Sequence, residues 1–150
     1  MLTRFALWSG HDSLREGAAL GLIVATSIWV WIALVDALVG ASFHTFAVLG
    51  GVAVFTVVHV LLNVVYGIVL MSTVHASRRE PSLIIGALFV FLTLEFAIAM
   101  VTILLSHLGL GELAWLRIFG ASLVGAALAL VLVSRGHPLA ARLHEAERER

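Results

Sequence analysis

Two ionisable residues lie inside long apolar stretches of the sequence. His59 lies in the run from Phe46 to Met71, and Glu95 lies in the run from Ser82 to Ser106. A charged side chain at the centre of a bilayer costs about 2.5–3.5 kcal/mol on insertion scales. Because that cost has to be offset by a specific environment, these two residues are the first candidates for chemistry.

Polar side chains accompany both residues. The second apolar run carries four of them at helical spacing, within about 80° of one another: Thr56, His59, Asn63 and Tyr66. Glu95 lies on a second polar face. Such faces turn inward in a membrane, because lipid offers no hydrogen-bond partner. We therefore expect His59 and Glu95 at similar depth in the core of the protein, joined by a direct or water-bridged hydrogen bond.

The predicted pair of His59 and Glu95 permits three interpretations. It could hold and pass a proton, as ionisable residues inside membranes do in proton relays. It could bind a ligand, with His59 as a single axial ligand to haem or to the magnesium of a pigment. It could also be a structural hydrogen bond that fixes which faces of two helices meet. The residue types leave all three open.

A second group of candidates lies at the ends of the apolar runs. Asp36, His44 and His107 are predicted on one side of the membrane, where imidazole and carboxylate groups could bind Zn²⁺ or Cu²⁺. Helix capping and contact with water are the alternative roles. His75 is predicted at the opposite surface. No Ser-His-Asp arrangement is evident, so no enzymatic activity is expected.

These candidates belong to a chain of 150 residues that is 61% hydrophobic and only 12% charged. Soluble domains have about a quarter of their residues charged, so the composition predicts an integral membrane protein. The formal net charge is zero, which offers no basic surface for nucleic acid. The lack of cysteine excludes disulfides and thiolate metal sites. The lipid bilayer is therefore an expected partner.

Four apolar runs have the length, roughly 20 residues, that an α-helix needs to cross a bilayer. They cover residues 17–39, 46–71, 82–106 and 117–134, and the second would include Gly50 and Gly51. Short connections favour antiparallel neighbours. The predicted fold is therefore all-α, an integral membrane four-helix bundle with up-down-up-down topology. Residues 1–16 are expected to form a cytoplasmic or interfacial segment, and residues 135–150 a charged cytoplasmic tail.

The arginines predict the orientation. All nine basic residues are arginine, and eight of them lie before the first run, between the second and third, or after the fourth. Only Arg117 lies on the other side. Because positive side chains are retained in the cytoplasm, both termini are predicted to be cytoplasmic in a bacterial inner membrane.

Small residues recur every four positions in two of the runs. They are Gly17, Gly21 and Ala25 in the first run and Ala121, Gly125 and Ala129 in the fourth. Small side chains let helix backbones approach closely in lipid. We expect the first helix to pack on the fourth through these residues, with contact to another subunit as the alternative.

Several short features resemble a loose class of small bacterial membrane proteins with four transmembrane helices and no assigned function. They are Arg15-Glu16-Gly17 before the first span, Asp36 at its end, His59 with Gly67 in the second, and Phe91 to Phe96 around Glu95 in the third. The resemblance covers most of the chain. It implies the four-helix fold and carries no activity over to particular residues.

The main functional hypothesis is a small membrane subunit, or an accessory and scaffolding protein, of a larger complex such as a respiratory or photosynthetic one. The small-residue faces and the charged tail favour it. The second hypothesis is proton-coupled transport or a proton relay through His59 and Glu95. The third is binding of haem, a pigment or a metal through histidine. Other membrane subunits or further copies of the chain are the expected partners.

Overall fold

The computed structural model describes residues 13–76 and 82–136, and it contains helices and no strand over these ranges. The long helices are α1 (Ser13–Leu38), α3 (Val52–Ala76), α4 (Ser82–Leu105) and α5 (Gly120–Gly136). The short elements are α2 (His44–Val48), η2 (Ser106–Leu110), η3 (Gly111–Leu113) and η4 (Trp115–Phe119). Four segments are long and apolar enough to cross a membrane. The predicted all-α, four-helix fold is confirmed, and the chain is a multi-pass membrane protein.

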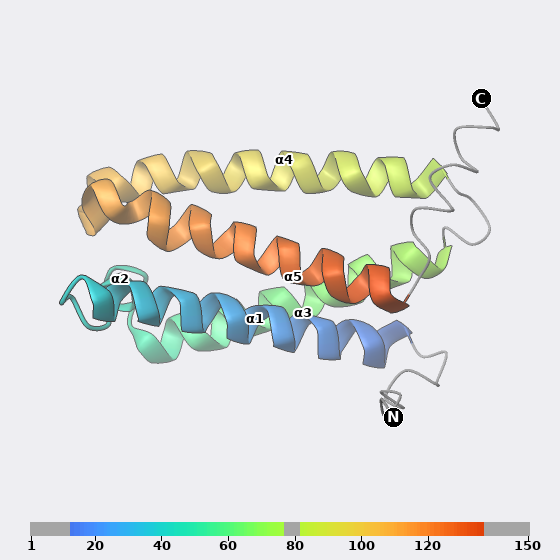
Figure 1. The fold of residues 1–150 in the computed structure, drawn as a ribbon, viewed down its shortest axis with the longest axis horizontal. Helices are drawn as coiled ribbons and strands as arrows, with labels where there is room; N and C mark the ends of the chain where they lie inside the picture. Colours follow the sequence, from blue (N-terminus) through green and yellow to red (C-terminus); the bar gives the residue numbers. More distant parts are fainter. Residues whose placement is uncertain (1–12, 77–81, 137–150) are drawn as a thin grey trace.

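The four long helices run alternately up and down (Figure 1). The start of α1 and the end of α5 lie at the same end of the bundle, which we call the terminal end. The short elements lie at the opposite end, which we call the loop end. The described chain runs along the length of the bundle four times. Both of its ends therefore lie at the same end of the bundle, as the up-down-up-down prediction requires.

Several predictions concern residues outside the described ranges. They include most of the cytoplasmic or interfacial segment at residues 1–16 and nearly all of the tail at residues 135–150. Six of the nine arginines also lie there: Arg4, Arg78, Arg79, Arg142, Arg148 and Arg150. The cytoplasmic assignment of both termini therefore stays a prediction.

The second apolar run forms two helices where the sequence predicts one. Gly50 and Gly51 have φ of +97° and +93°, in the region that glycine adopts readily and other residues rarely do. They end the short helix α2, and α3 begins directly after them and continues five residues beyond Met71. His59 therefore lies about two turns from the start of its helix. It is closer to the loop end of the span than predicted.

Three glycines bring α1 and α3 into direct backbone contact. A Cβ atom built on Gly67 would lie 2.7 Å from the Gly21 nitrogen, and one built on Gly17 would lie 2.7 Å from the Gly67 carbonyl oxygen. Both distances are shorter than a Cβ atom tolerates. The glycines therefore allow a separation that any larger residue would prevent. Such contacts matter in lipid, where the hydrophobic effect does not drive helices together.

The prediction for the small residues of α1 was wrong about the partner. Gly17 and Gly21 face α3, and α5 packs on a different side of α1. A Cβ atom on Gly125 of α5 would lie 2.7 Å from Ile28 Cδ1 and 3.2 Å from Val24 Cγ1. Helix α1 does contact the fourth span, but through large apolar side chains that fill the hollow left by small residues on α5.

The core forms around α1. One cluster of buried side chains joins α1, α3 and α5 near the terminal end: Leu20, Val24, Met71, Val74, Ala129 and Val133. A second lies nearer the loop end: Ile32, Phe46 and Ala121. None of the α4 side chains that the structure describes belongs to either cluster. Of its side chains described in the structure, Thr102 alone is buried. Helix α1 is thus the central element, and α4 lies at the edge of the bundle.

The close contact of α1 with α3 predicts different effects for two equivalent substitutions. Gly67→Val should destabilise the protein by about 1–3 kcal/mol, because the added side chain forces the two backbones apart. Gly86→Val is the matched control, since a Cβ atom there meets nothing within 4 Å. Unfolding in a denaturing detergent, followed by tryptophan fluorescence, measures both free energies. Equal stability of the two variants would contradict the backbone contact.

Candidate functional site

The predicted polar face of α3 contacts α1. His59 Nε2 lies 3.3 Å from the Ala25 carbonyl oxygen. The Asn63 amide donates to the His59 carbonyl at 2.9 Å and lies 3.3 Å from His59 Nδ1. Phe55 stacks on the imidazole with ring centroids 4.9 Å apart. Both ring nitrogens of His59 therefore have protein partners, which suits a residue that joins two helices.

Thr56 makes a second link between the same helices. Its hydroxyl accepts a hydrogen bond from Trp29 Nε1 at 3.0 Å and donates to the Val52 carbonyl at 2.6 Å. The glycine contact explains why these side chains reach α1, because it holds the two backbones close together along this face. Tyr66, the fourth residue of the predicted face, is half-buried, and Glu95 lies near enough to act on it electrostatically.

Glu95 has a different partner from the one predicted. The Ser122 hydroxyl on α5 lies 2.9 Å from Oε1 and 3.0 Å from Oε2 of Glu95. His59 contacts α1, whereas Glu95 contacts α5, and within the described ranges no direct hydrogen bond joins the two. The candidates Thr56, His59 and Asn63 therefore belong to one cluster, and Glu95 belongs to another that lies on the side of Tyr66.

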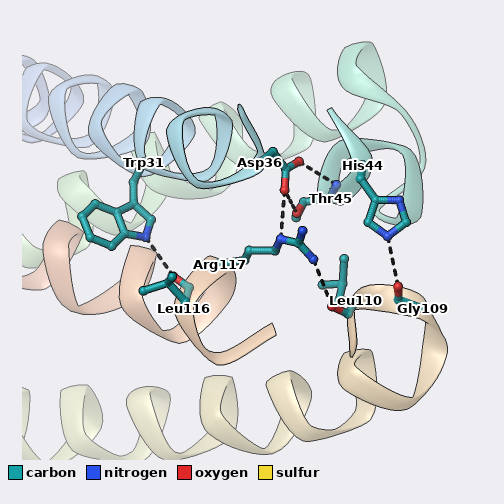
Figure 2. A network of polar contacts seen from close by, with 8 residues as sticks. All are labelled: Trp31, Asp36, His44, Thr45, Gly109, Leu110, Leu116 and Arg117. Carbon is teal, nitrogen blue, oxygen red and sulfur yellow. Dashed lines mark hydrogen bonds and ion pairs between the residues drawn. The ribbon is translucent and has the colours of Figure 1, made fainter. Parts of the chain in front are cut away.

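The most extensive polar network lies at the loop end and is shown in Figure 2. Asp36 is fully buried, and its carboxylate accepts hydrogen bonds from the backbone N–H of Thr45 at 2.8 Å and from the Thr45 hydroxyl at 2.7 Å. Arg117 Nε lies 2.9 Å from Asp36 Oδ1. The N–H of Nε is not aligned as a hydrogen bond, so the contact is an ion pair. A buried carboxylate and a buried guanidinium thus neutralise each other.

Local geometry brings these three residues together. The chain turns sharply between α1 and α2, with φ of +70° at Gly40 and +59° at Phe43. This turn places the N-terminus of α2, where backbone N–H groups lack helical acceptors, against the end of α1. The Asp36 carboxylate binds one of those N–H groups. Arg117 reaches the same carboxylate from η4, on the far side of the turn between α4 and α5.

Three further bonds stabilise that turn, one within it and two that attach it to α1 and α2. Arg117 Nη1 donates to the Leu110 carbonyl at 3.0 Å, and Trp31 Nε1 donates to the Leu116 carbonyl at 2.9 Å. His44 Nε2 lies 3.0 Å from the Gly109 carbonyl and therefore carries the proton. The irregular helical turns of η2 to η4 leave carbonyl groups without regular helical partners. Side chains of α1, α2 and η4 satisfy three of them.

The predicted metal ligands have other partners. Asp36 is bonded to Thr45 and Arg117, and His44 is bonded to a carbonyl oxygen. His107 lies exposed in η2. Over residues 13–76 and 82–136, no group of three or more His, Asp or Glu side chains is close enough together to hold a metal ion. The alternative role, in which residues at helix ends satisfy backbone groups, fits Asp36 and His44.

His75 is not the simple surface residue predicted from its position. Its Nε2 lies 3.4 Å from Oε2 of Glu16, and both side chains are largely buried. Glu16 lies in the first turn of α1 and His75 in the last turn of α3. This pair therefore joins the same two helices at the terminal end that His59 and Thr56 join further along.

Sequence reasoning missed the pairing of Asp36 with Arg117. Two signals were available: Arg117 is the one arginine that departs from the charge bias, and Asp36 is predicted at the same side of the membrane. The single arginine on this side, with the carboxylates of Asp36 and Glu112 predicted on the same side, indicates an ion pair with one of the two. The Ser122 contact of Glu95 had no comparable signal, because serine also occurs on the lipid-facing and packed faces of membrane helices.

The chain matches no protein-family model, no curated protein and no solved structure. Its function is therefore inferred from the geometry of the site.

Removal of Arg117 should be strongly destabilising. Arg117→Gln leaves the buried Asp36 carboxylate without its cation, and breaking a buried ion pair in this way costs about 3–5 kcal/mol. Arg135→Gln is the control, because Arg135 is exposed, and it should change the free energy of unfolding by less than about 0.5 kcal/mol. Detergent-induced unfolding of both variants makes the comparison, and a loss for Arg117→Gln as small as that of the control would refute the role of the pair.

Proposed function

We propose that the chain is a small membrane subunit, or an accessory protein, that assembles with other membrane helices through α4. The supporting observation is the uneven burial of the four spans. A third of the residues of the most apolar part of the α1 span are buried inside the protein, but only 6% of those of the α3 span and of the α4 span. Helix α3 still contributes Met71 and Val74 to the core, whereas no described side chain of α4 belongs to it. Phe89 and Phe96 of α4 are among the most exposed large apolar side chains of the described residues, at 71% and 70%.

The polar contacts between elements of the bundle support the same proposal. His59, Thr56, Asp36 and His44 use their polar atoms to join one helix or turn to another. These side chains give the chain a defined structure at α1, α3 and the loop end. Helix α4 is held mainly at its η2 end and by a few contacts with α3 and with Ser122. An edge helix of this kind offers a face to a partner helix in the bilayer.

Photo-crosslinking in native membranes tests the assembly. A benzophenone side chain introduced at Phe89 of α4 should yield a covalent adduct with another polypeptide. The same group at Leu34 of α1 is the control, since Leu34 is also apolar and 50% exposed but lies on the best-covered helix. Adducts from both positions in similar yield, or from neither, would contradict assembly through α4.

The proposal includes the orientation inferred from the arginines, with both termini in the cytoplasm of a bacterial cell. The chain has no cysteine, so a single introduced thiol is a unique label. Ser42 and Ala76 are both exposed and lie at opposite ends of the bundle. Ser42→Cys should react with a membrane-impermeant maleimide in intact spheroplasts, and Ala76→Cys only after the membrane is opened. The reverse pattern would show the opposite orientation.

A further inference from the structure

Glu95 has fewer hydrogen-bonding and charged partners than Asp36, another carboxylate in the described helices. It lies in the middle third of α4, within an apolar stretch, and is half-buried. Its polar contact is the Ser122 hydroxyl, which lies almost equally far from both carboxylate oxygens. A hydroxyl has one proton to donate, whereas an ionised carboxylate accepts about four hydrogen bonds. One donor leaves most of that capacity unused.

Asp36 is the instructive comparison within the same protein. Its carboxylate has an arginine partner and two hydrogen-bond donors, all held by buried structure. Glu16 likewise has a partner, the imidazole of His75, whose Nε2 lies 3.4 Å from Oε2. Glu95 takes part in no ion pair within residues 13–76 and 82–136. The negative charge of Asp36 is thus neutralised by an arginine, whereas an ionised Glu95 has no cationic partner among the described residues.

The ionisable side chains on the elements that contact α4 do not change this. Those elements are α3, η2, η4 and, through Ser122, α5. Arg117 is directed to Asp36, His59 to Ala25 and His75 to Glu16. His107 is exposed in η2, and Arg135 is exposed in the last turn of α5. Tyr66 on α3 is the remaining ionisable group near Glu95, and its neutral phenol supplies no positive charge.

We propose that Glu95 and Ser122 form a site in the apolar part of the bundle that binds and releases a proton. In the ionised state the Ser122 hydroxyl donates to the carboxylate. On protonation the carboxylate takes one proton from hydronium, releases a water molecule and becomes a neutral acid, which can donate to the Ser122 oxygen. Because a hydroxyl both donates and accepts, the contact between α4 and α5 persists in both states. The neutral form also removes the cost of an uncompensated charge in hydrocarbon.

The partial exposure of Glu95 makes the site accessible to a chemical probe. N,N′-dicyclohexylcarbodiimide is apolar and adds to the protonated carboxyl group, leaving an N-acylurea that mass spectrometry locates. The purified full-length protein in liposomes should be labelled at Glu95 and not at Asp36. Above the midpoint of the titration, labelling should fall about tenfold for each unit of pH, because the protonated fraction falls by that factor.

Two variants at Ser122 test the part played by its hydroxyl. Ser122→Ala removes the donor that favours the ionised carboxylate, so labelling of Glu95 at alkaline pH should increase severalfold over the unsubstituted protein. Ser122→Thr keeps a hydroxyl and should restore the original pH profile. Both substitutions are small, and circular dichroism verifies that the helices are retained.

Three results would overturn the proposal. They are absence of label on Glu95 at every pH between about 4 and 9, a range that includes the titration of a free glutamate, labelling that does not change with pH, and equal labelling of Asp36 and Glu95. An unchanged profile for Ser122→Ala would remove Ser122 from the site. The proton site goes beyond the proposed assembly and does not require it. The labelling experiment uses the purified chain without a partner, whereas the crosslinking experiment detects contact of a partner with Phe89.

Discussion

The ion pair between Asp36 and Arg117 is the interaction on which the loop end depends. A carboxylate and a guanidinium have both been taken out of water, and in apolar surroundings neither is tolerated without the other. Asp36 belongs to α1 and bonds to the first turn of α2, while Arg117 belongs to η4 and bonds to η2. One pair of charges therefore sets where four elements meet, and the bonds of Trp31 and His44 follow from that placement.

The central position of α1 has a second cause, which acts toward the terminal end. Small residues on one side of α1 admit the backbone of α3, and large residues on another side fill the hollow presented by Gly125 of α5. The short separation of α1 and α3 lets His59 reach the Ala25 carbonyl and lets Trp29 reach Thr56. The polar side chains of α3 are thus used for helix contacts, and Glu95 on α4 is left with a single hydroxyl.

Much of this fold follows from the sequence, because composition and the length of apolar runs are strong signals in a membrane protein. The four spans and their alternating direction were predicted correctly. The break at Gly50 and Gly51 was not, since glycine is common inside membrane helices and its backbone conformation cannot be known from the residue type.

The candidate sites were harder to predict than the fold. Thr56, His59 and Asn63 do share an inward face of α3, as the helical period indicates. Which helix that face meets depends on the rotation of neighbouring helices, so the bond from His59 to Glu95 was expected where bonds to Ala25 and Ser122 are found. Asp36 was identified as a candidate, but its partner Arg117 is 81 positions away in the sequence, and no local pattern links them.

A double-mutant cycle across the ion pair tests the account most directly. The free energy of unfolding would be measured for Asp36→Asn, Arg117→Gln and the combined variant in one detergent system. If the two charges stabilise each other, the combined variant loses less than the sum of the single losses, by about 1–3 kcal/mol. Additivity within about 0.5 kcal/mol would show that the two residues act independently and would contradict the central role of the pair.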